Sequence, residues 1–349
     1  MRPLILQSDF GYADGAVSAM YGVAECVSDQ LRVYDLTHDI PQYDIWEASY
    51  RLIQTVTYWP EGSVFVSVVD PGVGSTRRSI VVRTTGGQYV VTPDNGTLTH
   101  IKRMIGISEA RVIDESINRL PGSGESYTFH GRDIYAYTGA RLASGIITFE
   151  QVGPQVDVDS VVELPVVPAE LHDGIITGTI DVLDVRFGSL WTNISREMFR
   201  ELGIEHGQRA EITISNGTRT LYKNIVVYAK SFADVYVGDA LLYVNSLDNM
   251  ALAINQGSFA KAYSIGTGID AGKWFVKHGV KCVAMDSQAL DHPLHTAMGN
   301  NGMTRMNLLG ATGKPITEEY KELFGEDPLI KATMDKDPCK TREESLLEI

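Results

Sequence analysis

The chain has 349 residues, of which 44% are hydrophobic and 21% charged, a composition that excludes wholesale disorder and predicts about two globular domains. Acidic residues outnumber basic ones 44 to 30, and the formal net charge of −14 argues against nucleic acid or an anionic membrane surface as a partner. Three widely spaced cysteines give no disulfide framework, and no apolar segment is long enough for a signal peptide or a membrane span, so we expect a soluble cytoplasmic protein.

Strands and helices alternate at the start of the chain. Strands are predicted for Leu4–Leu6, Leu31–Leu36 and Ser63–Val69, which are rich in β-branched and apolar residues. Helices are predicted for about Ala16–Val27, which is rich in Ala, Met and Val, and for Ile45–Val56, in which apolar side chains recur every three or four residues. This alternation favours parallel strands in a sheet with helices on its faces.

A hairpin and a final helix complete this region. The strands Ser79–Arg83 and Gln88–Thr92 flank a pair of glycines, which predicts a tight turn between them, and Gly131–Leu142 is predicted to be the last helix. We therefore expect an α/β N-terminal domain over residues 1–153, mainly a parallel sheet between helices. Residues 154–170 contain three prolines and no helical period, so they are predicted to be a linker.

Beyond the linker the chain consists of short β-rich runs separated by Gly, Asn and Asp, which predicts an all-β, barrel-like C-terminal domain over residues 171–266. These runs are Gly174–Val185, Arg209–Ile214, Asn224–Val227 and Ala240–Asn245. Residues 267–349 form an additional C-terminal tail, an extension whose role the sequence does not identify. Within it Asp291, His292 and His295 lie close together, but no further ligands can be assigned, so no metal site is predicted.

Several polar residues stand where this fold would present them to a ligand. Asp9 and Asp70 each follow an apolar strand, and open α/β sheets bind ligands at the carboxyl ends of their strands, although capping of the next helix or turn would explain both equally well. Arg77 or Arg78 could fold back on Asp70 and hold it ionised, the alternative being a solvated charge pair. His130 precedes a glycine and a helix start, where it is either structural or catalytic.

Aromatic and short polar residues gather in the segment Asp184–Asn193. Phe187, Ser189 and Trp191 surround a glycine there. Aromatic rings beside small polar groups suit a flat heterocycle that is stacked on its faces and read at its edge, and core packing around a turn is the alternative.

Eight motifs between residue 4 and about residue 260 occur in one order: SDFG, DLTHDIPQYD, YWPEG, VVDPGVGSTRR, TPDNGTL, FHGRD, FGSLWTN and NQGS. In this order they resemble the S-adenosylmethionine-hydroxide adenosyltransferases, also called adenosylmethionine hydrolases (adenosine-forming), which are related to fluorinating and chlorinating enzymes. The resemblance implies an α/β domain and a β-barrel domain in a homotrimer. It also places the substrate between the N-terminal domain of one subunit and the C-terminal domain of the next.

The resemblance further implies hydrolysis of S-adenosyl-L-methionine to adenosine and L-methionine by water or hydroxide attack at C5′, without metal or cofactor. The family's water-activating trio falls on Asp70, Arg77 and His130. Asp9 would hold the ribose hydroxyls beside Tyr43. The remaining substrate contacts implied are Asp14, Asp184 and Ser246 for the methionine end, Phe187, Ser189 and Phe232 for the adenine, and Phe129 and Asn245 elsewhere in the pocket.

Two departures from the family pattern concern these contacts. Ser189 stands where the family usually has Asn, so the adenine would be read by a shorter group, through its backbone or through a water. Leu247 stands where the halogenating relatives have an arginine near the carboxylate of the substrate.

Two alternatives to hydrolysis are a halide-dependent displacement, which gives 5′-halo-5′-deoxyadenosine, and a non-catalytic sensor of S-adenosylmethionine or adenosine. In the fluorinating relatives Tyr occupies the positions of Asp70 and His130, and a halide-binding Ser occupies that of Gly131. They also carry a long insertion where this chain has only Thr84–Gly87. All four differences favour water as the nucleophile, and the intact trio argues against a sensor.

Overall fold

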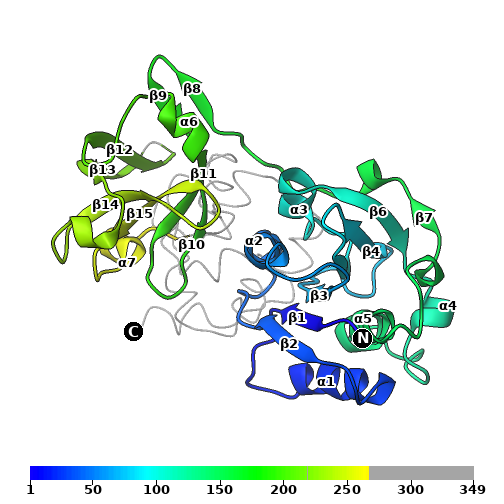
Figure 1. The fold of residues 1–349 in the computed structure, drawn as a ribbon. Coiled ribbons are helices and arrows are strands. Elements are labelled where there is room, and N and C mark those ends of the chain that lie inside the picture. The colour runs from blue at the N-terminus through cyan, green and yellow to red at the C-terminus, as the bar shows by residue number, and fades with distance from the viewer. Residues whose placement is uncertain (218, 267–349) are drawn as a thin grey trace, which may run out of the picture. The chain divides into compact units, whose positions relative to one another are not determined.

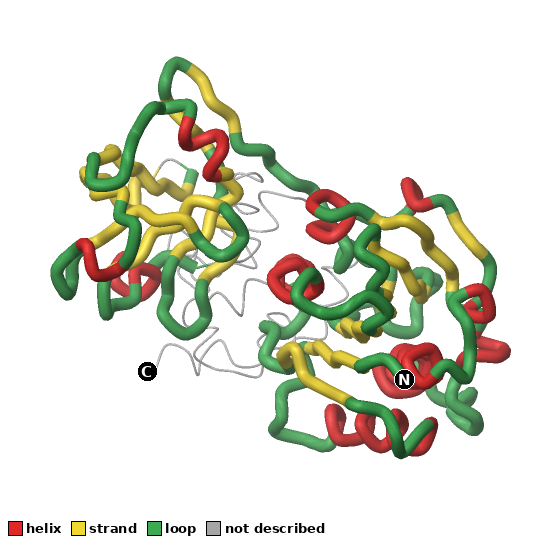
Figure 2. Tube along the Cα trace, in the orientation of Figure 1, coloured by secondary structure: helices red, strands yellow, loops and turns green. Residues whose placement is uncertain are grey.

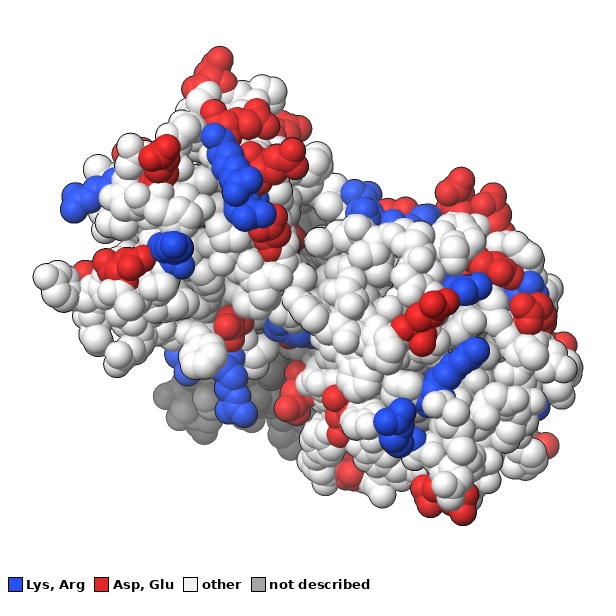
Figure 3. Space-filling model, viewed as in Figure 1, with Lys and Arg blue, Asp and Glu red and all other residues white. Residues whose placement is uncertain are grey.

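The computed structural model describes residues 1–217 and 219–266, which form two large sheets, a separate two-stranded ladder and their associated helices (Figures 1 and 2). The extension 267–349, with its Asp291, His292 and His295, lies outside the described residues. Within the described part, none of the helices combines the length and the apolar character that a membrane span requires. On the face of the molecule in Figure 3, acidic and basic side chains are interspersed rather than gathered by sign.

The first sheet has seven strands in the order β2-β1-β3-β5-β4-β6-β7. The pairs β1–β2, β1–β3 and β3–β5 are parallel, whereas β4–β5, β4–β6 and β6–β7 are antiparallel. The sheet is therefore mixed, and the expectation of a mainly parallel sheet is wrong. The predicted hairpin makes β4 antiparallel to β5, because so short a connection can join only antiparallel strands, and β6 and β7 then pair antiparallel beyond β4. The strands are β1 (Leu4–Ser8), β2 (Val33–Thr37), β3 (Val64–Val68), β4 (Ser79–Thr84), β5 (Tyr89–Pro93), β6 (Ile107–Val112) and β7 (Gln155–Val156).

Helices cover both faces of this sheet (Figure 1), because successive side chains of a strand point to opposite faces. Leu4 and Leu6 of β1 belong to the core formed with α1 (Ala16–Val27) and α5 (Tyr137–Ser144). Ile5 belongs to the opposite core, formed with α2 (Ile45–Val56) and α3 (Thr99–Met104). Both helices predicted in this part of the chain, α1 and α2, are confirmed.

The predicted helix Gly131–Leu142 is two helices of different pitch: a π-helix, η1 (Gly131–Ala136), and then α5. Gly139 of α5 is in close contact with the sheet, since a Cβ atom there would lie 2.4 Å from Cγ2 of Val66. The short elements in the rest of this region are α4 (Glu115–Asn118), η2 (Glu150–Val152) and η3 (Val158–Ser160).

The second sheet is curled into a half-barrel of six strands, in the order β10-β11-β15-β14-β13-β12. It confirms the β-rich texture predicted beyond the linker, although the short helices α6 (Arg196–Arg200) and α7 (Phe259–Tyr263) correct the expectation of an all-β region. Its strands are β10 (Ile180–Leu183), β11 (Leu190–Ser195), β12 (Arg209–Asn216), β13 (Arg219–Tyr228), β14 (Ala240–Val244) and β15 (Asn249–Ile254), with η4 at Phe232–Asp234 and a separate ladder of β8 (Glu170–His172) and β9 (Ile175–Thr177).

The buried His100 makes the stability of the N-terminal region depend on pH. Its Nδ1 lies 2.9 Å from Oγ of Ser49, and burial, with a smaller contribution from the Arg103 charge, lowers its pKa to about 4. Between pH ~6.5 and ~4 the unfolded chain therefore takes up a proton that the folded chain does not. We expect the free energy of unfolding to fall with falling pH in this window, with His100 contributing up to about 1.4 kcal/mol per pH unit.

Urea denaturation at a series of pH values measures this slope. His100→Asn should reduce the slope, whereas the same change at His172, whose side chain is 81% exposed, should leave it unaltered. An unchanged slope in His100→Asn would show that other groups dominate the acid sensitivity.

Candidate active site

Asp9 and Asp70 lie at the same edge of the first sheet. β1 and β3 are parallel neighbours, and their register pairs Ser8 with Val68. The two carboxylates follow these paired residues by one and two positions, so both chains leave the sheet side by side. Burial raises the pKa of Asp9, and the neighbouring charge of Asp70 raises it further, which places the two carboxylates within electrostatic reach.

Arg77 folds back on Asp70, as one of the two interpretations of this segment predicts. Its Nε donates to Oδ1 at 2.6 Å and its Nη2 donates to Oδ2. The side chains of Asp70 and Arg77 are only 5% and 12% exposed, so this is a desolvated pair, and the alternative of a solvated pair is wrong. Arg78 pairs instead with Asp94, with 2.8 Å between its Nε and Oδ2.

His130 stands at the start of the π-helix η1 and faces the same arginine. Its Nδ1 lies 3.4 Å from Nη2 of Arg77. Burial, and then the Arg77 charge, lowers the pKa of His130, so the ring is neutral at pH 7 and one nitrogen keeps a lone pair. Gly131 brings this helix start against the SDFG loop, because a Cβ there would lie 2.9 Å from Cζ of Phe10. π-Helical turns are frequent at functional sites.

Asp9 connects two of the sequence motifs. Its Oδ2 accepts the backbone N–H of Tyr43 at 2.9 Å, and Tyr43 itself adopts a left-handed backbone with φ 69°. At the start of α1 it is Asp14 that accepts a backbone hydrogen bond, from the N–H of Ala16 to its Oδ1 at 2.8 Å. Asp14 is exposed, as is the side chain of Tyr43. Phe129 packs edge-on against Phe10, with ring centroids 5.6 Å apart.

A polar chain that is buried at Ser8 and His38 supports the loop that carries Asp9, and sequence reasoning did not identify it. Oγ of Ser8 lies 2.7 Å from Nδ1 of His38, and Nε2 of His38 lies 3.0 Å from Oδ1 of Asp35. Tyr12 also donates to Asp35, at 2.6 Å. The order Ser-His-Asp is that of a hydrolase triad, but Ser8 is completely buried within β1. These hydrogen-bonded side chains therefore orient the loop and offer no accessible nucleophile.

The second sheet presents a different group of predicted residues, beginning with a turn at Asp184. The N–H of Asp184 donates to the carbonyl of Ser189 at 2.9 Å, and its Oδ1 accepts the N–H groups of Arg186 and Phe187, both at 3.1 Å. This turn leaves the Phe187 ring 72% exposed, while Ser189 is buried. Core packing is thus the wrong explanation for Phe187, which is free to stack on a ligand.

Tyr243 links the other aromatic residues of this group, although nothing in the sequence singled it out. Its ring lies 5.2 Å from that of Phe232, and its hydroxyl accepts a hydrogen bond from Nε1 of Trp191 at 3.2 Å. The pKa of Tyr243 is raised, chiefly by burial, and hydrogen bonds from Ser189 and Trp191 offset part of this effect. Phe232, Tyr243 and Ser189 therefore belong to one connected cluster.

Asn245 shapes the turn that follows β14. Its Oδ1 accepts the N–H groups of Leu247 at 2.9 Å and of Asn249 at 3.1 Å. Asn245 itself is buried and Ser246 is exposed. Asn245 is thus a turn-forming residue that holds Ser246 at the surface.

The two groups differ in the chemistry that they offer. The first combines a desolvated carboxylate–guanidinium pair with a neutral imidazole, which suits activation of water and stabilisation of a developing anion. The second offers an exposed aromatic ring with small polar groups, which suits recognition of a heterocycle. Among the described residues no group of three or more His, Cys, Asp or Glu side chains is arranged to hold a metal ion.

Comparison with known proteins gives matches along most of the chain. Residues 4–153 match the family model of the SAM hydroxide adenosyltransferase N-terminal domain, and residues 178–271 match that of its C-terminal domain. A protein of Salinispora arenicola named (R)-S-adenosyl-L-methionine hydrolase is 33% identical over 75% of this chain and 93% of its own length. A Thermus thermophilus protein of the same name is 32% identical over 77% and 98%.

More distant matches include a halogenating enzyme and a solved structure. A fluorinase of Actinopolyspora mzabensis is 27% identical over 77% of this chain and 96% of its own. The crystal structure of an uncharacterized conserved protein from Thermotoga maritima superimposes with a TM-score of 0.70 at 28% identity, covering 76% of this chain and 97% of that one.

Proposed function

The chain belongs to the SAM hydroxide adenosyltransferase family, and we propose that it hydrolyses S-adenosyl-L-methionine to adenosine and L-methionine. One observation carries the proposal: a chain with about one-third identity to named hydrolases joins Asp70, Arg77 and His130 in one desolvated cluster. Water attacks C5′ of the ribose, and methionine leaves as a neutral thioether. The reaction as proposed requires neither a metal nor a cofactor.

The electrostatics of the proposed displacement suit a dry site. The substrate is a sulfonium cation and the nucleophile is hydroxide-like, so charge disappears as the transition state forms, and exclusion of solvent favours that change. The difficult step is to generate hydroxide from water, whose pKa is ~15.7. We assign Arg77 to stabilise the developing negative charge, and Asp70 or the neutral His130 to orient the water and take its proton.

We propose that the substrate is held by both groups of residues. Asp9 would bind the ribose hydroxyls beside Tyr43, a role supported by its position at the sheet edge next to Asp70. The exposed Phe187 ring would stack on the adenine. The other proposed contacts are Phe129, Ser189, Phe232 and Asn245 near the nucleoside, and Asp14, Asp184 and Ser246 at the methionine end. We further propose a homotrimer in which the two groups that form one site come from neighbouring subunits.

The packing around Gly131 supports water over halide as the nucleophile. In the fluorinating relatives a halide-binding Ser corresponds to this position. Here a Cβ would lie 2.9 Å from Cζ of Phe10 and 3.3 Å from Cγ1 of Val68, and Val68 is a buried residue. Placing a Ser side chain at this position therefore requires the Phe10 ring to move.

A product assay tests the proposed function directly. Purified protein is incubated with each sulfonium epimer of S-adenosyl-L-methionine, because the relatives are named for the (R) form, and the products are separated by chromatography. Equimolar adenosine and methionine are the expected products. A protein that binds the substrate without turning it over would be a sensor, and 5′-halo-5′-deoxyadenosine as the main product would indicate halide transfer.

A further inference from the structure

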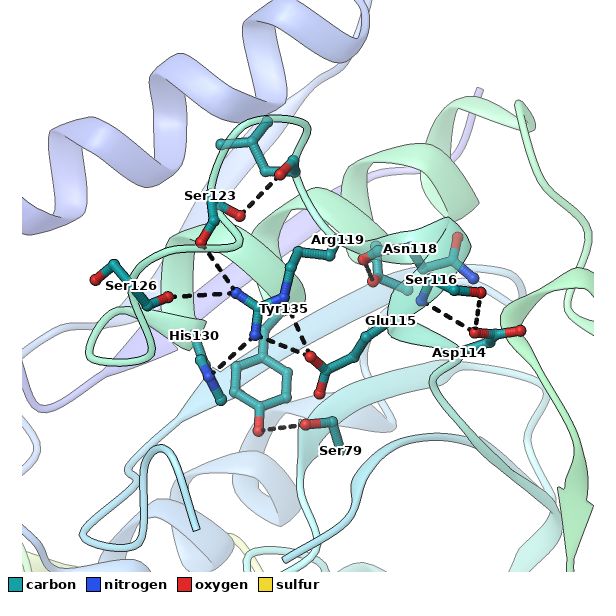
Figure 4. A network of polar contacts seen from close by, with 12 residues as sticks. Ser79, Asp114, Glu115, Ser116, Asn118, Arg119, Ser123, Ser126, His130 and Tyr135 are labelled. Atoms are coloured by element: carbon teal, nitrogen blue, oxygen red, sulfur yellow. Dashed lines mark hydrogen bonds and ion pairs between the residues drawn. The ribbon is translucent and has the colours of Figure 1, made fainter. Parts of the chain in front are cut away.

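Arg119 lies on the side of His130 opposite Arg77, and neither the sequence motifs nor the family comparison assigns it a role. Its Nη2 is 3.3 Å from Nε2 of His130 (Figure 4). The guanidinium is held by Glu115, to which Nη2 donates at 2.8 Å and Nε at 3.1 Å. The Arg119 side chain is only 11% exposed, so this ion pair is desolvated on the arginine side.

Further contacts fix the guanidinium from behind. Its Nη1 lies 3.4 Å from the carbonyl oxygens of both Ser123 and Ser126, and its Cζ lies 5.0 Å from the centroid of the Tyr127 ring. All these residues belong to the segment that joins α4 to the π-helix. Arg119 thus ties that segment to Glu115 and to the imidazole, and Figure 4 shows it at the centre of the network.

The position of His130 between two guanidinium groups restricts its protonation. Guanidinium groups only donate hydrogen bonds, whereas a neutral imidazole has one acceptor nitrogen and one N–H. Only one of Arg77 and Arg119 can therefore donate to the ring at a time. Protonation of the imidazole would remove its single acceptor nitrogen, and then neither arginine could donate to it. It would also place a third positive charge between two others, a strongly unfavourable arrangement in a partly buried site.

We propose that Arg119, anchored by Glu115, is a positioning residue for hydrolysis: from the Nε2 side it holds the imidazole of His130 in place and in the neutral form. This inference rests on the proposed function, in which the neutral His130 orients the attacking water. The proposal also gives a role to the ion pair between Glu115 of α4 and Arg119, whose guanidinium is directed at the His130 ring.

The charged groups that face His130 predict opposite effects for the two partners. Burial lowers its pKa first, Arg77 and Arg119 lower it further, and Glu115 and Asp70 raise it, while the Tyr127 ring is the other titratable neighbour, 6.3 Å away. Arg119→Gln removes a cation and leaves Glu115 unpaired, so the pKa of His130 should rise. Glu115→Gln removes an anion and should lower it.

Two measurements follow these changes. In Arg119→Gln we expect kcat to fall about tenfold, the scale for slight misplacement of an acid–base group, with KM little altered. The acidic limb of its kcat–pH profile should move to higher pH. Histidine ¹³C NMR, with the His130 signal assigned by its loss in His130→Gln, should show the same direction of shift, and the opposite direction in Glu115→Gln. Arg119→Lys, which keeps the cation, should retain most of the low pKa.

Arg141→Gln is the matched control. Arg141 anchors the same short helix from α5, by donating to the carbonyl of Ile117 at 2.7 Å and to Oδ1 of Asn118 at 2.8 Å, and none of these contacts involves His130. Arg141→Gln should therefore leave the acidic limb of the kcat–pH profile at the wild-type pH. Equal shifts in Arg141→Gln and Arg119→Gln, or an unmoved His130 signal in Arg119→Gln, would reduce Arg119 to a structural role. The NMR titration needs no turnover, so it tests this inference even if the wild-type protein fails to hydrolyse S-adenosylmethionine.

Discussion

Replacing Asp70 or His130 by alanine is expected to lower kcat for S-adenosyl-L-methionine by at least about 10²-fold, the usual scale for a positioned acid–base group. Both side chains face Arg77 in the desolvated cluster, where water is proposed to be activated. Substrate affinity should change much less, because neither residue is assigned to the adenosine or methionine contacts. Initial rates of adenosine formation give kcat, and calorimetric titration of the substrate into each variant gives the affinity.

Loss of folding must be separated from loss of chemistry in these variants. Asp70→Ala leaves a buried guanidinium without its carboxylate, which can cost about 3–5 kcal/mol of stability. The neighbouring pair Arg78–Asp94 provides a control, since the Asp94 side chain is 1% exposed and is assigned no part in the reaction. Asp94→Asn should lower the stability of the protein, but it should lower kcat by less than about tenfold. Near wild-type turnover in a folded Asp70→Ala or His130→Ala would show that the trio is wrongly assigned.

The sequence predicted best those elements whose signals are local. The helices Ala16–Val27 and Ile45–Val56 have the predicted bounds, because apolar periodicity marks their buried faces and Asp44 caps the second one by accepting the N–H of Glu47 at 2.8 Å. Strands with weaker patterns were missed. β6 carries charged residues, and β15 combines Asn and Ala with its longer apolar side chains, so neither shows a β-branched run.

Segment 184–193 illustrates how one stretch can carry two signals. Its aromatic and small polar residues were interpreted as ligand-binding material, yet its second half, Leu190–Asn193, lies within β11. Only the first half forms the exposed turn that presents Phe187. The composition identified the turn, but the strand became evident only from its pairing with β10 and β15.

The candidate site shows the same division between local and tertiary information. The spacing between Asp70 and the two arginines could not choose between Arg77 and Arg78. The choice follows from the strand they precede: successive residues entering β4 point to opposite sides, so one arginine reaches Asp70 and the other reaches Asp94. Likewise, Glu115 and Arg119 are recognisable as a pair four residues apart, but the contact with His130 depends on how the intervening segment folds.

The oxygen at C5′ of the product adenosine is expected to come from solvent, and neither chloride nor fluoride should replace it. A halide that entered beside Arg77 would also meet the carboxylate of Asp70, and like charges about 4 Å apart at an effective dielectric constant of about 20 repel by about 4 kcal/mol, roughly a thousandfold in rate. Asp9 already experiences the field of Asp70, which contributes to its raised pKa. Water avoids this repulsion by donating a hydrogen bond to Asp70 while Arg77 supports its oxygen.

Single-turnover reactions in oxygen-18 water with up to molar chloride or fluoride test this expectation, with mass spectrometry of the nucleoside product as the readout. Labelled adenosine should account for essentially all product at every halide concentration. Asp70→Asn provides a matched variant, because it removes the negative charge and keeps the shape of the side chain. If repulsion by this carboxylate excludes anions, the share of 5′-halo product should rise in the variant even though total turnover falls. Unlabelled adenosine would show that the oxygen does not come from solvent, and 5′-chloro-5′-deoxyadenosine as the main product of the wild-type enzyme would show that the carboxylate of Asp70 is no barrier to an anionic nucleophile. Either result would overturn the hydroxide mechanism.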